Sequence, residues 1–252
     1  MRFSPQLRAL DWLVARPIAH RGLHDETKGV VENTEAAFAW AATHDYAIEC
    51  DIQLTRDGEA VVFHDEALER VTEGTGLVID HTVAQLKKLK YRQSDARMQT
   101  LNELLEQVDG KVPLVIEIKT IWDGGQPLTL RALKVLQSYK GPYALMSFDP
   151  DAVALLAEIS PNTVRGMTAD RGVDPYYNIL PVPRRLQLQR LSHLQKTRPH
   201  FVSFNFKDLP FAPVQSIRAM GFPVITWTIR SKADEAQARR WCDQVTFEGF
   251  HA

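Results

Sequence analysis

Short apolar segments alternate with helical segments along most of this chain, and that alternation constrains its fold more than any other feature. About eight apolar segments have the length and composition of buried strands, and a helical pattern follows each of them. We expect strands at residues 17–20, 47–55, 112–119, 143–148, 163–168, 201–204, 223–229 and 244–247. In 252 residues, this pattern predicts an α/β protein, a (β/α)8 TIM barrel.

The main alternative is an open doubly wound sheet, which has the same alternation. Its glycine-rich phosphate loop, G-x-G-x-x-G, is missing from the sequence, whereas ionisable residues recur at the ends of several expected strands. A ring of strands around one site explains that recurrence better. We therefore expect one domain over residues 1–252, with an insertion between the second and third barrel strands at about residues 66–100.

Apolar residues at helical spacing predict helices at residues 7–14, 35–44, 82–89, 101–108, 128–139, 150–159, 186–197, 212–220 and 232–241. We expect the first helix to close the bottom of the domain. A helix on a membrane surface is the alternative, but this segment has no dense cationic face. Pro175, Pro181 and Pro183 predict a long irregular loop at residues 170–185.

The strongest functional signal lies between Ala47 and Asp65, in the sequence A-I-E-C-D-I-Q-L-T-R-D-G-E-A-V-V-F-H-D. Its first half is an expected strand, so Glu49 and Asp51 lie on one face and Cys50 on the other. Two carboxylates side by side repel each other unless a cation or a proton lies between them. An edge strand with a solvated acidic face is the alternative, but the flanking residues are too apolar for an exposed edge.

Ionisable residues also end the neighbouring apolar segments. His20 and Arg21 end the first expected strand, and His64 ends the apolar run after the second. Glu117 and Lys119 share one face of the third. A lone histidine at a strand end is more often a buried residue bonded to a carbonyl oxygen, but His20 has charged residues at the neighbouring strand ends.

These residue types together indicate a chemistry. The carboxylates of Glu49, Asp51 and Glu117 favour Ca²⁺ or Mg²⁺ over zinc, which would want more nitrogen or sulfur ligands. Arginine and lysine add fixed positive charge for an anion. Two histidines can divide acid and base roles near neutral pH. The set suits a phosphodiester, because cations stabilise charge on the phosphoryl oxygens while histidines activate a nucleophile and protonate the leaving alkoxide.

Composition excludes other classes of protein. The chain has 30 Lys and Arg against 31 Asp and Glu and no basic run, so nucleic acid is not an expected partner. Cys50 and Cys242 suit a reducing compartment, although one disulfide is the alternative. The sequence has no signal-like apolar run and no segment long enough to cross a membrane, so we expect a cytoplasmic protein. It carries no signal of oligomeric state.

Several longer motifs extend over most of the chain. They are H-R-G from His20, E-N-T from Glu32, the run from Ile48 to Asp65, L-E-R-V-T-E-G-T-G from Leu68, I-E-I-K from Ile116, S-F-D from Ser147 and T-W-T-I from Thr226. In this combination they resemble the glycerophosphodiester phosphodiesterase family, most specifically in the first half of the chain. The family insertion corresponds to the region after residue 66.

The resemblance implies a TIM-barrel enzyme that hydrolyses glycerophosphodiesters to sn-glycerol 3-phosphate and an alcohol. It implies that His20 and His64 are the catalytic acid and base, while water or the glycerol 2-hydroxyl attacks phosphorus. Trp227 would pack against the glycerol moiety, and a tryptophan that only fills the barrel mouth is the alternative.

The resemblance also implies a divalent cation cofactor, Ca²⁺ or Mg²⁺. Its ligands would be Glu49, Asp51 and Glu117, and the phosphate of the small-molecule substrate would contact Arg21 and Lys119.

Four positions depart from the family pattern. Val31 replaces the usual proline before E-N-T, residues 99–103 replace P-T-L-E-E, and Arg230 replaces the asparagine after the late tryptophan motif. The last strand lacks the usual Thr-Asp and continues to Glu248 and Phe250. We expect Arg230, Glu248 and Phe250 to line the top of the barrel, where the alcohol group of the substrate binds.

Two other functions stay open at this point. One is a phospholipase D-like phosphodiesterase that acts on lysophospholipids. The other is a barrel that binds a phosphate-containing ligand without turnover, which the intact set of histidines and carboxylates disfavours.

Overall fold

The structure, a computed structural model, describes residues 10–92, 94–173 and 175–252. Within these residues, eight parallel strands form a barrel that closes because β1 pairs with both β2 and β9. The barrel strands are β1 (Ile18–Ala19), β2 (Ala47–Leu54), β4 (Leu114–Ile118), β5 (Tyr143–Ser147), β6 (Arg165–Ala169), β7 (Phe201–Asn205), β8 (Val224–Ile229) and β9 (Gln244–Phe247). The predicted TIM barrel is confirmed, and the open-sheet alternative is wrong.

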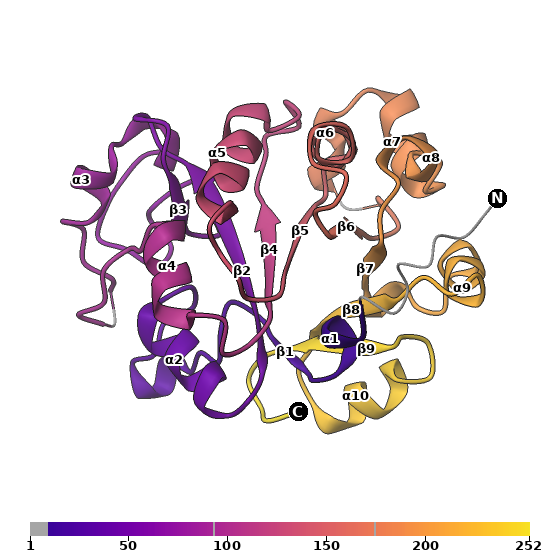
Figure 1. Cartoon of the computed structure of the whole chain (residues 1–252), viewed down its shortest axis with the longest axis horizontal. Helices are drawn as coiled ribbons and strands as arrows, with labels where there is room; N and C mark the ends of the chain where they lie inside the picture. The colour runs from indigo at the N-terminus through magenta and orange to yellow at the C-terminus, as the bar shows by residue number, and fades with distance from the viewer. Residues whose placement is uncertain (1–9, 93, 174) are drawn as a thin grey trace.

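Helices surround the strands (Figure 1). Those that follow barrel strands are α2 (Glu35–Thr43), α4 (Leu101–Val108), α5 (Gln126–Leu136), α6 (Pro150–Ile159), α7 (Val182–Gln189), α8 (Leu194–Thr197), α9 (Ala212–Ala219) and α10 (Lys232–Ala238). Helix α4 shows why they pack there: Leu101, Leu104, Leu105 and Val108 recur at helical spacing and are all buried. The last strand, β9, departs from the expected alternation, because no helix follows it in residues 248–252.

The interior of the barrel is apolar at its bottom and charged at its top. Val115 and Phe201 point inward and form one buried cluster with Leu13 of α1 (Asp11–Val14), which closes the bottom as predicted. Residues 7–9 of that expected helix lie outside the described residues. Two residues beyond Val115, on the same face of β4, lies Glu117. The strand period therefore places the carboxylates directly above an apolar floor.

The insertion between the second and third barrel strands is present. It begins with β3 (Ala60–Val62), which pairs antiparallel with β2, and includes η3 (Val78–Asp80) and α3 (Val83–Leu86). A separate buried cluster that includes Phe63 and Leu68 forms its apolar core. The segment projects from one side of the barrel near α3 (Figure 1) and returns at Thr100, which bridges to β3.

The expectation of an irregular loop at residues 170–185 is wrong at its second half. Helix α7 begins at Val182, and Pro183 occupies its first turn, where the missing N–H of proline costs nothing. A 3₁₀ helix, η4 (Pro175–Ile179), precedes it. The predicted helix at residues 186–197 is two helices, because Leu191 adopts a left-handed backbone conformation with φ +51° between α7 and α8.

The structure also tests the predictions about the two cysteines and about membrane-spanning segments. Cys50 and Cys242 are both buried free thiols, so the disulfide alternative is wrong. Across the described part of the chain, none of the helices combines the length and the apolar character that a membrane span requires. The remaining 3₁₀ helices, η2 (Glu26–Lys28) and η5 (Phe206–Asp208), lie in loops after β1 and β7.

Candidate active site

A cavity of about 280 Å³ lies at the carboxyl ends of the barrel strands. This is the end at which TIM-barrel enzymes place their active sites. The predicted catalytic, metal-ligand and substrate-contact residues line this cavity: His20, Arg21, Glu49, Asp51, His64, Glu117, Lys119 and Trp227. The structure thus brings together residues that are up to 207 positions apart, from His20 to Trp227.

The three predicted metal ligands form one carboxylate cluster. Strands β2 and β4 pair so that Asp51 lies beside Glu117, and Glu49 is two residues earlier on the same face. One oxygen from each carboxylate lies within 4.8 Å of the other two. All three residues are buried, with 2%, 2% and 6% of Glu49, Asp51 and Glu117 exposed. Buried carboxylates this close need a cation or a proton among them.

The neighbouring charges distinguish the members of the cluster. Burial, with the negative charges of Asp51 and Glu117, raises the pKa of Glu49 well above its usual range. Burial alone would also raise the pKa of Asp51, but Lys119, His64 and Arg21 lower it. The ammonium nitrogen of Lys119 lies 2.8 Å from Glu117 Oε1 and 3.5 Å from Asp51 Oδ1. Burial would lower the pKa of Lys119, but these carboxylates raise it, so the ammonium stays charged.

A tight turn after β1 aims Arg21 at the same cluster. Arg21 has φ +55°, its backbone N–H donates to Glu49 Oε2 at 2.9 Å, and its Nε lies 3.5 Å from Asp51 Oδ2. Gly22 follows with φ +80°, and a Cβ there would approach the backbone of Ala37 within 2.8 Å. Only glycine fits this turn. The left-handed conformations of Arg21 and Gly22 therefore direct the backbone N–H of Arg21 toward Glu49 and its guanidinium toward Asp51.

Each predicted catalytic histidine is held by a carboxylate through its Nδ1 atom. His20 Nδ1 lies 2.5 Å from Glu248 Oε2, and His64 Nδ1 lies 2.6 Å from Asp65 Oδ1. An ionised carboxylate only accepts hydrogen bonds, so we assign the ring hydrogen to Nδ1 in both residues. This leaves Nε2 for proton exchange, and His20 Nε2 lies 4.0 Å from Glu49 Oε2. Burial lowers the pKa of His20, and the bond to Glu248 opposes that effect.

Comparison with known proteins agrees with this arrangement. The sequence profile described as the glycerophosphoryl diester phosphodiesterase family matches residues 20–250. The chain belongs to this family. A glycerophosphodiester phosphodiesterase of Caldanaerobacter subterraneus is 32% identical over 229 residues, which are 86% of each chain. The enzyme of the same name from Bacillus subtilis is 26% identical, over 77% of this chain and 70% of its own.

Solved structures have the same fold. The glycerophosphodiester phosphodiesterase of Thermotoga maritima superposes with a TM-score of 0.70 at 26% identity, over 92% of this chain and 94% of its own. A phosphodiesterase of Oleispira antarctica, solved with the product sn-glycerol-3-phosphate, has a TM-score of 0.77 at 22% identity, over 92% of both chains. At that identity the second likeness shows the fold alone.

Three residues that depart from the family pattern, Arg230, Glu248 and Phe250, lie in different places relative to the cavity. Arg230 lines the cavity, and Glu248 bonds His20. Phe250 does not line the cavity: its ring packs on Phe247 and beneath the Lys232 ammonium, so that expectation is wrong. The side chain is apolar, and the core beside β9 buries it better than the charged mouth would.

Residues that sequence reasoning gave no role also support the site. Arg70, in the insertion, contacts both Asp65 and Glu32, and Glu32 in turn accepts a bond of 2.8 Å from Arg21. This chain of ion pairs connects His64, through the contacts of Arg70, to Arg21. The E-N-T motif marked Glu32, but nothing local in the sequence pairs it with an arginine 38 positions later.

Proposed function

We propose that this protein is a metal-dependent phosphodiesterase that hydrolyses glycerophosphodiesters to sn-glycerol 3-phosphate and an alcohol. The observation that carries the proposal is the buried cluster of three carboxylates in one cavity with two carboxylate-held histidines, an arginine and a lysine. Family membership supports it, and the named relatives are glycerophosphodiester phosphodiesterases.

The carboxylate cluster fits a hard divalent cation. Its donors are all oxygen atoms, which is the ligand preference of Mg²⁺ and Ca²⁺. Burial, with the negative charges of Asp51 and Glu117, raises the pKa of Glu49, and a bound cation would offset the repulsion among these carboxylates. We therefore assign Glu49, Asp51 and Glu117 as ligands. The bound cation would neutralise charge on the phosphoryl oxygens.

The cationic side chains next to the cluster are suited to the phosphate. Arg21 and Lys119 stay protonated and point into the cavity, where they would bond the non-bridging oxygens of the substrate and stabilise charge that grows on them. Trp227 also lines the cavity and packs edge-on against Phe148, with ring centroids 5.5 Å apart. This pair offers an apolar wall for the carbon side of glycerol.

Proton transfer is assigned to His20 and His64. One Nε2 atom removes the proton of the attacking hydroxyl, which belongs to water or to the 2-position of glycerol. The other histidine, protonated, gives its Nε2 proton to the oxygen of the departing alcohol. The carboxylates of Glu248 and Asp65 hold the two rings in the tautomer that this exchange requires.

The direct test is coupled detection of glycerol 3-phosphate released from glycerophosphocholine, glycerophosphoethanolamine and glycerophosphoglycerol. We expect release with Mg²⁺ or Ca²⁺, none with chelator, and a loss of about 10²- to 10⁴-fold in kcat for His20→Ala or His64→Ala. His81→Ala is the matched control, because His81 is a partly exposed histidine in the insertion that does not line the cavity. Ligand-induced stabilisation without product, in either cation, would instead identify a phosphate-binding barrel.

A second cavity favours larger substrates as an alternative. It has a volume of about 970 Å³, adjoins the first at His64 and Lys119, and includes the aromatic side chains of Phe148, Tyr177 and Trp227. A space of this size with aromatic side chains in its lining, beside the groups proposed to bind phosphate, could accept the acyl chain of a lysophospholipid. Faster release of choline from lysophosphatidylcholine than of glycerol 3-phosphate from glycerophosphocholine would establish that substrate class.

A further inference from the structure

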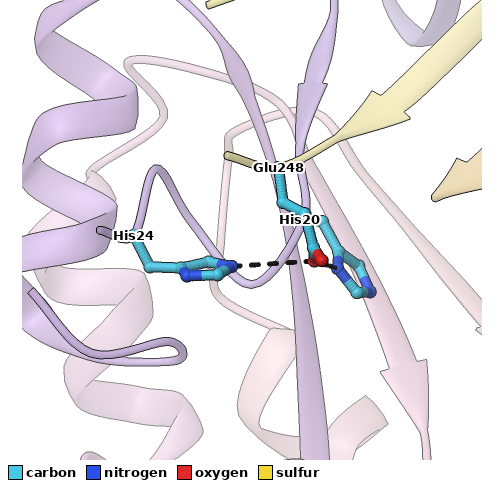
Figure 2. A group of neighbouring side chains, drawn as sticks. All are labelled: His20, His24 and Glu248. Atoms are coloured by element: carbon cyan, nitrogen blue, oxygen red, sulfur yellow. Dashed lines mark hydrogen bonds and ion pairs between the residues drawn. The ribbon is translucent and has the colours of Figure 1, made fainter. Parts of the chain in front are cut away.

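A second group of potential metal ligands lies beside the carboxylate cluster. It consists of His20, His24 and Glu248, and one ligand atom from each lies within 4.8 Å of the other two. Figure 2 shows the Glu248 carboxylate between the two imidazole rings. Two nitrogens and one oxygen differ from the all-oxygen cluster, and they are ligands that Zn²⁺ prefers over Mg²⁺ or Ca²⁺.

The fold brings these residues together through the pairing of β1 with β9. Ile18 and Ala19 pair with Thr246 and Phe247, so the next residues, His20 and Glu248, emerge side by side. The backbone N–H of His20 continues the ladder with a bond of 2.9 Å to the carbonyl oxygen of Phe247. The glycine turn after Arg21 then returns the chain and brings His24 over the same carboxylate.

One of the three potential ligand atoms, His24 Nε2, has no hydrogen bond within the described part of the chain. His24 Nε2 lies 3.7 Å from Glu248 Oε2, and this buried nitrogen has no hydrogen-bond partner among the residues that the structure describes. The contact with Glu248 is too long for a hydrogen bond, and a buried polar atom without one is costly, so a metal ion would satisfy this nitrogen. Zinc bonds of about 2.1 Å place tetrahedral ligands about 3.4 Å apart, so small side-chain shifts would bring the three atoms into position.

Arg230 affects the site without occupying it. Its Nε and Nη2 atoms lie 2.8 Å and 2.7 Å from Glu248 Oε1, which leaves Oε2 to face the two histidines. The guanidinium therefore fixes the carboxylate as a ligand with one available oxygen. Its positive charge also opposes a second cation nearby, so removing it should tighten cation binding.

We propose that His20, His24 and Glu248 form a second cation site, which takes Zn²⁺ and inhibits the enzyme when it is filled. The inhibitory part rests on the proposed function of His20. A neutral imidazole that binds metal through Nδ1 keeps its hydrogen on Nε2. In that state the Nε2 atom of His20 cannot accept a proton from the nucleophile, and Glu248 no longer holds the ring for catalysis.

The test measures Zn²⁺ binding by calorimetry with saturating Mg²⁺, which occupies the carboxylate cluster. We expect one Zn²⁺ per chain for wild type and for the control His81→Ala, and at least about tenfold weaker binding for His24→Ala and His24→Gln. Arg230→Gln should bind Zn²⁺ more tightly than wild type. Two histidine variants are used because glutamine keeps much of the volume of His24 if alanine impairs folding.

Two results would overturn the site. One is equal Zn²⁺ affinity in wild type and both His24 variants. The other is Zn²⁺ binding that disappears as Mg²⁺ is raised, which would place the ion in the carboxylate cluster. The binding measurement does not require turnover, so it judges the site even if the proposed hydrolysis fails. Where hydrolysis is present, Zn²⁺ should inhibit wild type at concentrations at least about tenfold lower than it inhibits His24→Gln.

Discussion

At the scale of single residues, the protein buries charged side chains that destabilise an apolar core. Three buried carboxylates within 4.8 Å of one another, beside a buried lysine, are costly unless a ligand balances them. Such arrangements cluster at functional sites, because charge that is unfavourable in the free protein becomes favourable around the bound cation and phosphate.

This cost predicts the behaviour of Glu49→Gln. Without metal, the variant should be more stable than wild type by about 1–2 kcal/mol, because glutamine avoids both the cost of burying a carboxylate among others and the cost of protonating it on folding. With Mg²⁺ at about 100 times its Kd, wild type should gain about 2.7 kcal/mol and the variant much less. Thermal unfolding with and without Mg²⁺ measures both. Equal stabilisation of the two proteins by Mg²⁺ would remove Glu49 from the ligand set.

Asp65 is predicted to act only through His64. Asp65→Asn should lower kcat by up to about 10²-fold with little change in KM, because the amide no longer fixes the Nδ1 hydrogen. The double variant with His64→Ala should be no slower than His64→Ala alone, since the two residues act as one unit. Losses that multiply would show that Asp65 acts independently of the histidine.

His193 makes stability depend on pH. Only 1% of this residue is exposed, and its ring nitrogens have no hydrogen-bond partner among the described residues. Burial, with the positive charge of Arg184, lowers its pKa from 6.5 to about 4. The unfolded chain therefore takes up a proton first, and stability falls as pH drops from about 6.5 to about 4, by up to about 3 kcal/mol.

Urea unfolding of wild type and His193→Leu between pH 7.5 and 4 tests this prediction. The variant should lose less stability over that range than wild type, and the control His81→Ala, which changes a partly exposed histidine, should behave as wild type does. The same slope with pH in wild type and His193→Leu would contradict the assignment.

At the scale of elements, strand pairing determines which side chains share the interior. Gly166 of β6 lies directly beside Phe201 of β7, whose fully buried ring fills the lower barrel. A Cβ at residue 166 would lie 2.2 Å from the ring. Gly166→Ala should therefore destabilise the protein by about 1–3 kcal/mol, and adding Phe201→Leu should recover part of that loss. Denaturant midpoints measure both, and an unaffected Gly166→Ala protein would refute the packing argument.

Some helices and strands could be predicted from the sequence, and others could not. Strands β2 and β4 were predictable because apolar residues alternate with charged ones over one strand length. The start of α7 was not, because Pro183 is typical both of a loop and of a first helical turn. The break at Leu191 was also hidden, since a left-handed leucine has no signal in composition.

At the scale of the whole molecule, the ring of strands makes a site from residues distributed along the chain. The charged members of the cavity on the first three barrel strands were predictable, because residues at the carboxyl ends of barrel strands converge on one place, whereas members such as Thr168, Asn205 and Lys207 were not. The contacts of Glu248 with His20 and of Arg70 with Glu32 were not, because they depend on which strands become neighbours at closure and on where the insertion folds back.

Metal-dependent hydrolysis of a glycerophosphodiester is best tested by phosphorus NMR of glycerophosphocholine incubated with the wild-type protein, with Mg²⁺ and with chelator. With Mg²⁺, we expect the diester resonance to be replaced by that of glycerol 3-phosphate, while choline is released without phosphate. A transient cyclic glycerol phosphate would identify the 2-hydroxyl as the nucleophile. Phosphocholine as the product, or equal turnover in the presence of chelator, would contradict the account.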